Sequence, residues 1–411
     1  MSTRKIFNDP IYGLVSFPFD SLYTLIEHPY FQRLRRISQM GLSNYVYPSA
    51  NHSRFSHALG ALYLMTTVIH SLREKGVDIN DQEYEAVCQA ILLHDIGHGP
   101  FSHGLEELIY PRHHEDISLE IMEALNKEMG GQLDLAIRIF RKEYKRPFLQ
   151  QLVSSQLDMD RLDYLIRDSF HTGVAEGVIG YKRLISMMNV VDDELVVEEK
   201  ALFSIEKFIV ARHIMYWQVY LHKTSIVAER MLKEFVRRLV ELVEEEDNVE
   251  VASQTADTAL VRFFKRRING TINDTNYLEE FTRLDDVDVL TTIKATVNHP
   301  DYILRYLSKH ILNRHLHKLI LKDSAINSDL IAEKRQNLKA QLLKEGKHPE
   351  NIDQIVSRLI YIGTESNQAY NQTKETIQVL RKNGDVLPIS AVLDNLINVR
   401  KITKYYLCYP R

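Results

Sequence analysis

Cysteine is scarce in this sequence. Only Cys88 and Cys408 occur among 411 residues, and neither has a partner at a spacing typical of a metal site or a redox pair. This scarcity excludes a disulfide-stapled scaffold and a cysteine-based zinc module, and it indicates a reducing compartment. The N-terminal MSTRKIFNDPIYG has no apolar run behind its basic residues, and no stretch reaches the roughly 18 apolar residues of a membrane span. We therefore expect a cytoplasmic protein that does not cross a membrane.

An excess of charge of one sign is also lacking. The formal net charge is -4, so the whole molecule is not an electrostatic attractor for nucleic acid. Two basic clusters remain, at residues 33–36 (RLRR) and 265–267 (KRR). Such clusters suit small phosphate ligands as well as polymers, and we interpret the second cluster as solvated surface. Nucleic acid is therefore a possible ligand but is not favoured.

Most of the sequence has helical spacing. Apolar residues recur at intervals of three and four, as in residues 59–66 and 87–94. The exceptions are Glu194 to Ile205 (ELVVEEKALFSI), which predicts a β-hairpin, and Ile402 to Tyr409 (ITKYYLCY), which predicts a strand. The expected fold is mainly α, with a helical core, a small β-hairpin and a mixed α/β C-terminal subdomain.

The unusual polar residues are concentrated in the first part of the chain. We expect a catalytic core over residues 1–240, a helical extension with charge runs such as RLDDVD over 241–320, and a C-terminal subdomain over 321–411. In that last part, a lysine- and glutamate-rich helix is predicted to end at Gly346, and Pro349 to open the next helix.

Separated histidines and carboxylates suggest a metal site. His57 lies in HSRFSH, His94 and Asp95 lie in LLHDIGHGPFSH, and Asp160 lies in LDMDRLDYLIRDS. The apolar AILL run before His94 and Asp95 predicts that both are buried, and an isolated buried carboxylate costs several kcal/mol unless it is paired or metal-bound. A cation held by these four side chains would compensate the charge and leave positions open for water and a phosphate oxygen.

The alternative for each lone histidine is a hydrogen-bonded core residue, which is the commoner role of a histidine on an apolar helix. Three histidines and one aspartate lie within ten positions of LLHDIGHGPFSH, interrupted by Gly97, Gly99 and Pro100. That composition is typical of a shaped site rather than of simple packing. A cation bound by imidazole and carboxylate is most plausibly Mn, Fe, Zn or Ni, with Mg as a candidate additional ion.

Residues 8–225 resemble the HD-domain phosphohydrolases, and within them the deoxynucleoside triphosphate triphosphohydrolases, which include enzymes with a sterile alpha motif. The strings that carry the resemblance are FQRLRRISQMG, NHSRFSHALG, LLHDIGHGPFSH, HHED, LDMDRLDYLIRDSFHTG and YLHK. The resemblance implies that His57, His94, Asp95 and Asp160 bind the metal and that Arg54 contacts phosphate. Arg54 and His57 would share one face of a helix, because they are three residues apart.

The resemblance also implies roles around the attacked phosphorus for His103 and His114, with Glu106 and Glu115 nearby. Either imidazole could move a proton to the leaving oxygen or orient a water, and a carboxylate would fix its tautomer. Which histidine donates the proton stays open, and His98 has either a catalytic or a supporting role.

A third set of residues is expected to contact the substrate. Asp160, Tyr164 and either Arg167 or Asp168 recur at helical intervals, so one helix face would point at the substrate. In the resembling family the positions of Arg161, Tyr164 and Asp168 approach phosphate and sugar. This chain has Arg161 where relatives often have lysine, which keeps the charge but alters the donor geometry. Asp158 and Asp163 are expected to cap or pair locally.

We further hypothesise that the pocket separates deoxyribose from ribose. Gln39 and Asp168 would hold the 3′-hydroxyl, while Met40 and Tyr220 would crowd the 2′ carbon. The alternative for Tyr220 is a core aromatic, because Tyr216, Trp217 and Tyr220 share apolar helical spacing.

Regulation by a nucleotide is a separate hypothesis, based on a partial match to regions where relatives bind an activating nucleotide between subunits. The matching residues are Glu27, Gln32, Arg35, His222 and Lys223. Relatives often have aspartate where this chain has Glu27. The resemblance accordingly suggests a homodimer or homotetramer.

The expected reaction is metal-dependent hydrolysis of a deoxynucleoside triphosphate to a deoxynucleoside and triphosphate. One alternative is an HD-type hydrolase of a nucleoside monophosphate or a cyclic nucleotide. A guanosine-tetraphosphate hydrolase is less favoured, because such enzymes resemble HDxxED where this chain has HDIGHG. A third alternative is a nucleotide sensor, or a module that binds single-stranded nucleic acid through Arg33, Arg35 and Arg36.

Overall fold

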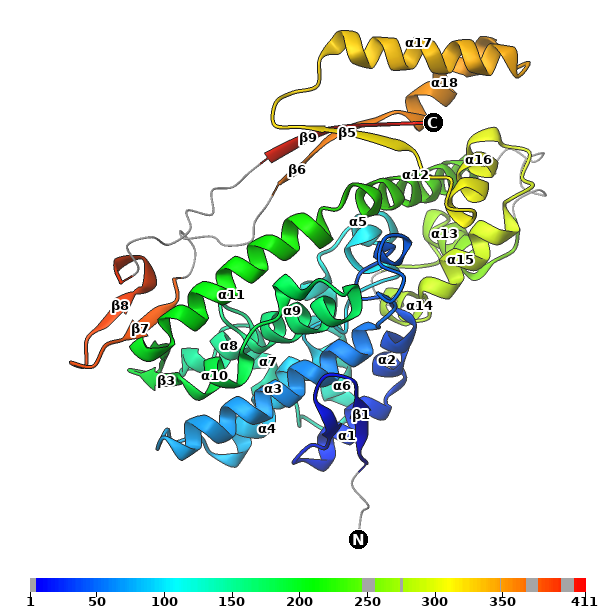
Figure 1. The fold of residues 1–411 in the computed structure, drawn as a ribbon. Coiled ribbons are helices and arrows are strands. Elements are labelled where there is room, and N and C mark those ends of the chain that lie inside the picture. The colour runs from blue at the N-terminus through cyan, green and yellow to red at the C-terminus, as the bar shows by residue number, and fades with distance from the viewer. Residues whose placement is uncertain (1–4, 246–255, 274–275, 348, 367–375, 393–402) are drawn as a thin grey trace.

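The computed structural model describes residues 5–245, 256–273, 276–347, 349–366, 376–392 and 403–411. Helices form an elongated body, and a smaller layer of strands and two helices lies along one side of the long helix α12, Lys223–Glu245 (Figure 1). The fold is mainly α, as the sequence predicts. None of the described helices combines the length and apolarity that a membrane span requires.

The body is built around α3, which packs against both α4 and α9. The helix α3 is buried on nearly all sides, because apolar residues surround it rather than forming one stripe. The helix α9 begins where the Asp158 side chain accepts a hydrogen bond from the Arg161 amide at 2.7 Å, and it ends at Gly173, whose φ is 73°. The helices of the body are α1 Asp20–Glu27, α2 Pro29–Gln32, α3 Arg54–Glu74, α4 Asp81–Leu93, α5 Glu106–Ile109, α6 His114–Glu128, α7 Asp134–Phe140, α8 Pro147–Val153, α9 Met159–Thr172, α10 Tyr181–Ser186, α11 Leu202–Met215 and α12.

A β-hairpin is present, but its position differs from the prediction. Its strands are β3, Met188–Val191, and β4, Glu194–Glu198. Asp192 and Asp193 form the two-residue turn with φ of 52° and 60°, a conformation that aspartate tolerates better than most residues. The segment ALFSI, predicted as the second strand, instead begins α11. An apolar run of this length does not distinguish a strand from a buried helix.

The rest of the chain forms the helical extension and the outer layer. The extension contains α13 Ala259–Ile268, α14 Tyr277–Phe281, α15 Asp286–Ala295 and α16 Tyr302–Leu312. The remaining elements are the N-terminal hairpin β1 Phe7–Asp9 and β2 Gly13–Val15, and then β5 Lys318–Lys322, α17 Ser328–Lys344, α18 Pro349–Leu359, β6 Tyr361–Ser366, β7 Gln378–Leu380, β8 Val386–Pro388 and β9 Thr403–Tyr409. The predicted boundaries at residues 240 and 320 lie inside α12 and β5.

The outer layer confirms three local predictions. Strand β9 is central in the antiparallel sheet β5-β9-β6, although Ile402 lies outside the described residues. The predicted helix ends beside Gly346, whose φ is 76°, and α18 begins at Pro349.

Strand β7 pairs in parallel with β4, so the C-terminal part of the chain returns to the body.

The close approach of α3 to α9 requires glycine at position 60. A Cβ there would overlap the side chains of Asp163 and Arg167. We predict that Gly60→Ala lowers the free energy of unfolding by about 1–3 kcal/mol or more, because overpacking would displace a buried ion pair. Denaturant unfolding measures this change. Gly180→Ala is the matched control, since nothing lies within 4 Å of its added Cβ, and it should change stability by less than about 0.5 kcal/mol. Equal effects of the two substitutions would contradict the prediction.

Candidate functional site

Three segments bring the four predicted metal ligands together. His57 lies on α3, His94 and Asp95 follow the end of α4, and Asp160 lies in the first turn of α9. The Nε2 atom of His57 is 3.1 Å from Oδ1 of Asp160 and 3.6 Å from Oδ2 of Asp95. The Nε2 atom of His94 is 3.5 Å from the same oxygen of each aspartate. The ligand atoms of His57, His94 and Asp160 thus lie close enough together to hold one ion. Oδ2 of Asp95 lies beside the two histidines but also accepts from Arg54.

The hydrogen bonds of the two histidines show which ring nitrogen faces this candidate site. Nδ1 of His57 lies 2.8 Å from Oδ2 of Asp163, and Nδ1 of His94 lies 2.6 Å from the Ile91 carbonyl oxygen. Since those oxygens can only accept, each Nδ1 carries the proton and each Nε2 has a free lone pair. Both Nε2 atoms are buried without a hydrogen-bond partner. This donor set fits a divalent transition metal.

The electrostatics of the site also favour a cation. Burial alone would lower the pKa of His57, but the neighbouring carboxylates of Asp160 and Asp163 raise it to about 10. Burial alone would likewise raise the pKa of Asp95, but Arg54 and then His94 hold it well below its usual range. The buried carboxylates therefore stabilise positive charge, which protons or a metal ion can supply.

The loop that carries Asp95 depends on glycine for its close contact with α6. A Cβ on Gly97 would overlap the backbone at His114 and Ser118. The Ser118 hydroxyl also donates to the His94 carbonyl and accepts from the Gly97 amide, both at 2.9 Å. The glycines of LLHDIGHGPFSH thus allow the loop to lie directly on the start of α6.

A cavity of about 370 Å³ opens beside the candidate metal site. The predicted residues that line it are Gln39, Met40, Arg54, Asp95, His98, His103, His114, Asp160, Tyr164, Asp168 and Tyr220. Other lining residues include Ser43, Ser102, Tyr216, Ser225 and Glu229, which the sequence interpretation did not select. Ser102 could have been found, because it lies inside LLHDIGHGPFSH. Ser225 and Glu229 carry no local signal, since they are ordinary polar residues on α12.

Arg54 lies at the wall of this cavity. Its Nη1 donates to the Asp95 carboxylate, and its Nε donates to the Ser102 hydroxyl at 2.8 Å. The side chain is buried. These two contacts fix its orientation and therefore the direction of its other N–H groups. A guanidinium in this position can bind phosphate oxygens beside a metal ion.

Another part of the cavity lining is aromatic and polar. The Tyr220 hydroxyl donates to Oδ2 of Asp168 at 2.7 Å, and Nε2 of His52 lies 2.7 Å from Oδ1 of the same residue. Tyr220 also packs edge-on against Tyr164 and Tyr216. It lines the cavity and also packs against the hydrophobic core. Gln39 contributes a buried Oε1 without a hydrogen-bond partner among the described groups.

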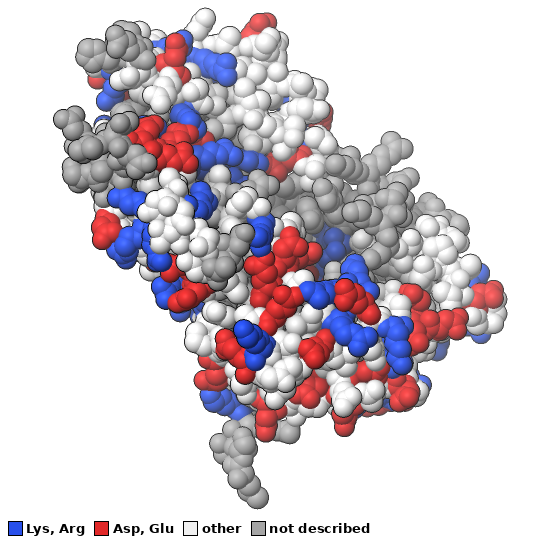
Figure 2. Space-filling view, turned by 180° about the vertical axis from the view of Figure 1, so that it is seen from behind, with Lys and Arg blue, Asp and Glu red and all other residues white. Residues whose placement is uncertain are grey.

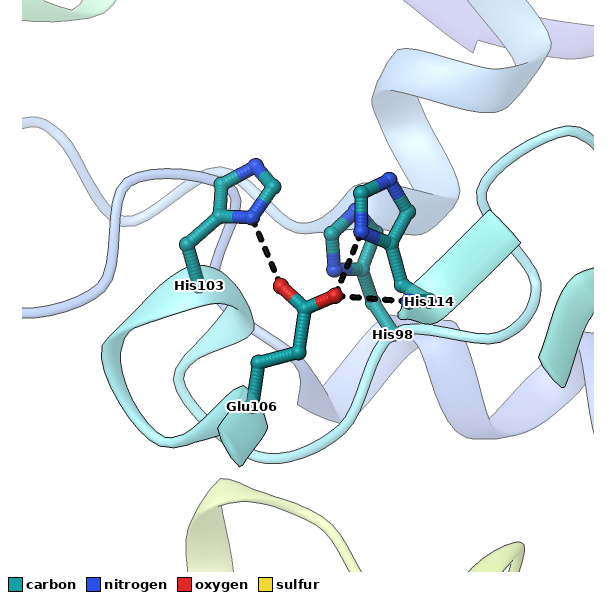
Figure 3. Close-up of side chains that lie close together, drawn as sticks. All are labelled: His98, His103, Glu106 and His114. Carbon is teal, nitrogen blue, oxygen red and sulfur yellow. Dashed lines mark hydrogen bonds and ion pairs between the residues drawn. The ribbon is translucent and has the colours of Figure 1, made fainter. Parts of the chain in front are cut away.

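His98, His103, Glu106 and His114 form a second cluster next to the cavity (Figure 3). The Glu106 carboxylate lies 2.9 Å from Nδ1 of His103 and 2.7 Å from Nδ1 of His114, and it accepts the His114 backbone amide at 2.6 Å. Burial alone would raise the pKa of Glu106, but the hydrogen bonds to His103 and then His114 hold it well below its usual range. An ionised Glu106 thus fixes the tautomers of two imidazoles.

The geometry of this cluster favours proton transfer over ion binding. The rings of His98 and His114 are stacked with centroids 3.9 Å apart and planes 14° apart. A nitrogen lone pair lies in the plane of its ring, so two parallel stacked rings cannot both direct lone pairs at one ion about 2.1 Å away. Burial and the neighbouring Arg54 hold the pKa of His98 well below its usual range, so its imidazole is neutral.

Some predicted site residues do not line the cavity. Among the described residues, the lining lacks Arg161, Glu115, Glu106, His57 and His94. Of these, Glu106 contacts two histidines that line it, and His57 and His94 belong to the candidate metal site. Arg161 forms an ion pair with Asp158 at 3.6 Å, because it follows Asp160 directly and so faces another side of α9. Glu115 is exposed in the first turn of α6. Asp158 caps α9 as expected, whereas Asp163 also orients His57, a role that its sequence position did not indicate.

The five residues predicted to bind an activating nucleotide fall into two groups. Glu27 forms an exposed ion pair with Lys5, and Gln32 accepts a hydrogen bond from Arg35. His222 and Lys223 lie at the start of α12, where His222 accepts a hydrogen bond from the Thr224 amide.

The basic residues 33–36 have structural partners. Arg33 is buried and donates to three backbone carbonyls. The Arg35 guanidinium lies 3.6 Å from the centroid of the Phe55 ring, and Arg36 donates to Asp285. Arg33 is therefore not available to nucleic acid, which weakens the hypothesis of single-strand binding through this cluster. The interpretation of residues 265–267 as solvated surface is also incomplete, because Arg267 donates to two backbone carbonyls beside α5.

Comparison with known proteins identifies the family. Residues 54–168 match the model of the HD domain, and residues 179–276 match that of the HD associated region. A crystal structure of a phosphohydrolase from Bacteroides thetaiotaomicron is similar over 99% of this chain and 100% of that chain, with 46% identity and a TM-score of 0.91. The chain belongs to the HD-domain phosphohydrolase family.

Other members of this HD-domain family are more distant. The uncharacterized protein YwfO of Bacillus subtilis is 32% identical over 78% of this chain and 72% of its own length. The human deoxynucleoside triphosphate triphosphohydrolase SAMHD1 is 29% identical over 72% of this chain and 52% of its own length. The chain thus spans about half the length of that human relative.

The candidate metal site allows a prediction of how the loss of one carboxylate ligand changes metal content and turnover. Asp95→Ala should leave purified protein with less than about a tenth of the wild-type metal content and with no measurable turnover, because the site loses an anionic ligand. Elemental analysis of purified protein measures the metal directly. Asp329→Ala, which removes an exposed carboxylate from α17, is the control and should retain both properties. Full metal occupancy and activity in Asp95→Ala would place the metal elsewhere.

Proposed function

We propose that this HD-domain phosphohydrolase hydrolyses a deoxynucleoside triphosphate to a deoxynucleoside and triphosphate. One observation carries the proposal. The partnerless Nε2 atoms of His57 and His94 face two carboxylates beside a cavity that also holds Arg54, and that cavity continues to Asp168. Its volume is in the range of small-ligand sites, and its chemistry changes from cationic at one wall to aromatic at the other. A phosphate beside Arg54 and a sugar beside Asp168 match this division.

His57, His94, Asp95 and Asp160 would hold a divalent metal. When bound, such an ion supplies the positive charge that polarises a phosphate oxygen. Arg54 binds the phosphate from the other side, and its contacts with Asp95 and Ser102 orient it before substrate arrives. Much of the catalysis is then charge stabilisation and positioning rather than covalent chemistry.

Proton transfer would be carried out by the cluster of His103, Glu106 and His114. Water attacks the α-phosphorus, the bond from that phosphorus to the 5′-oxygen breaks, and a protonated imidazole donates a proton to the leaving 5′-oxygen. The proton released by the attacking water restores the imidazolium. Glu106 supports this exchange because it accepts from both Nδ1 atoms and leaves each Nε2 to transfer a proton.

On the face shown in Figure 2, the surface charge is less suited to a nucleic acid polymer than to a small nucleotide. Basic and acidic side chains are interspersed there rather than gathered into one positive tract. A backbone-binding groove would need a continuous positive surface.

Product analysis tests the reaction class. We expect wild-type protein given a mixed nucleotide pool to release deoxynucleosides and inorganic triphosphate, because phosphates bound by Arg54 would lie beside the candidate metal site. Chromatography of nucleosides and phosphates separates this outcome from release of monophosphates or opening of cyclic nucleotides. Assays with single nucleotides and with pairs also test activation by a second nucleotide. Oligonucleotide binding without turnover of any nucleotide would contradict the proposal.

The aromatic wall predicts discrimination between sugars. We expect kcat/KM for deoxyribonucleoside triphosphates to exceed that for the matched ribonucleotides by about tenfold to hundredfold, because a 2′-hydroxyl buried without a partner costs roughly 1–3 kcal/mol. Tyr220→Ala should reduce this preference to a few-fold, whereas Tyr220→Phe should keep most of it, since the ring remains. Equal rates for both sugars in wild type, or a preference unchanged in Tyr220→Ala, would contradict a sugar-discriminating role for Tyr220.

A further inference from the structure

The loop after Asp95 contains a strained backbone segment at the wall of the cavity. Phe101 and Ser102 are consecutive residues with φ of 55° and 54°, in the left-handed region that residues with a Cβ rarely occupy. Phe101 is 4% exposed and its neighbour 3%, so solvent does not stabilise this conformation. Such strain persists only where surrounding contacts hold it.

The contact that holds this segment comes from a distant part of the chain. The buried carboxylate of Asp286 accepts the Phe101 amide on Oδ1 at 2.6 Å. Its Oδ2 accepts the Ser38 amide at 2.9 Å. Asp286 lies in the first turn of α15. It belongs to the segment RLDDVD, which the sequence analysis treated only as a run of charge. One side chain thus joins two segments that both lead into the cavity wall.

The Ser102 hydroxyl connects these segments to Arg54 by two hydrogen bonds. The Ser102 hydroxyl donates to the Ser38 carbonyl at 2.7 Å and accepts from Nε of Arg54 at 2.8 Å. The left-handed turn is what brings this hydroxyl to Arg54, and His103 follows it directly. Asp286 itself does not line the cavity among the described residues. One route from Asp286 to the Arg54 side chain passes through Ser102, and another passes through the Ser38 segment, which forms a β-bridge to Ser53.

Arg33 also binds the same loop by hydrogen bonds. Its guanidinium donates to the carbonyls of Ile96 and His98 at 2.9 and 2.8 Å, and to the carbonyl of Leu284 at 3.2 Å. The junction between α14 and α15 is thus attached to both ends of the loop, by Arg33 near its start and by Asp286 near its end.

We propose that Asp286 is a positioning residue for the phosphohydrolase reaction, because it holds Phe101 and Ser102 in the left-handed turn that orients Arg54 and His103. The neighbouring acids have other tasks. Asp285 and Asp288 form a reciprocal cap at the start of α15, and Asp285 also accepts from Arg36. The effect on catalysis rests on the proposed function, whereas the effect on the loop backbone does not.

The test compares Asp286→Ala and Asp286→Asn with Asp288→Ala. Asp288→Ala removes a carboxylate from the same helical turn and breaks its 2.9 Å bond to the Asp285 amide, so it matches the loss of helix capping. Asp286→Asn keeps the size of the side chain but offers one acceptor oxygen to two amides, so it should fold where alanine fails to do so. All variants are measured as full-length protein.

Hydrogen exchange gives the readout that does not depend on turnover. In both Asp286 variants we expect the peptide spanning residues 99–104 to exchange at least about tenfold faster than in wild type, because the Phe101 amide loses its acceptor or shares it. Asp288→Ala should leave this peptide unchanged. Metal content should remain at the wild-type level in all three variants, since Asp286 does not contact the four candidate ligands.

Kinetics give the second readout. We expect kcat to fall about tenfold to hundredfold in Asp286→Asn with KM changed less than about threefold, because displaced groups at the reacting centre impair the chemical step more than binding. Asp288→Ala should retain kcat. Wild-type exchange of the loop in Asp286→Asn, or the same kcat as Asp288→Ala, would overturn the positioning role. A wild-type protein without turnover on any nucleotide would defeat the proposed function, and loop exchange would still decide whether Asp286 holds the turn.

Discussion

The buried carboxylate of Asp95 and the partly buried carboxylate of Asp160, which face two imidazole lone pairs, are the constraint on which the rest of this structure depends. Asp95 follows the end of α4 and Asp160 lies on α9, and both lie close to Nε2 of His57. Such an arrangement is costly unless positive charge lies between the carboxylates. Arg54 supplies part of that charge, and a divalent metal would supply it with better geometry. The three segments that converge here, α3, the end of α4 and the start of α9, are also the centre of the helical body.

The hydrogen bonds and ion pairs that hold the candidate metal ligands in place extend well beyond the ligands themselves. Asp163 orients His57 and is itself held by Arg167 at 2.9 Å and by the Tyr12 hydroxyl at 2.8 Å. Arg167 continues to Asp9, so the N-terminal hairpin takes part in fixing one candidate ligand. Outer partners of this kind set the tautomer and orientation of a metal-binding histidine. Gly60 is required for the same reason, because a side chain there would displace this network.

Local sequence patterns predicted much of the fold, and the family resemblance predicted most of the cavity lining. Helical spacing indicated the mainly α architecture, and the shared face of Asp160, Tyr164 and Asp168 was correct because one helix determines all three positions. The hairpin was misplaced because an apolar run such as ALFSI fits either a buried helix or a strand. The predicted contact of Arg161 with substrate stays a prediction, because Arg161 pairs with Asp158 and does not line the cavity among the described residues.

The residues that sequence analysis missed share a physical origin. Asp286 meets Phe101 across 185 positions of sequence, and Arg33 meets Leu284 across 251. Neither contact leaves a periodic signal, so both residues were interpreted by composition alone, as a charge run and a basic cluster. Chemistry-bearing ligands occur in short motifs because a helix or a tight loop can aim several of them at once. The groups that hold such motifs in place need only one well-placed donor or acceptor, and the fold can supply it from any part of the chain.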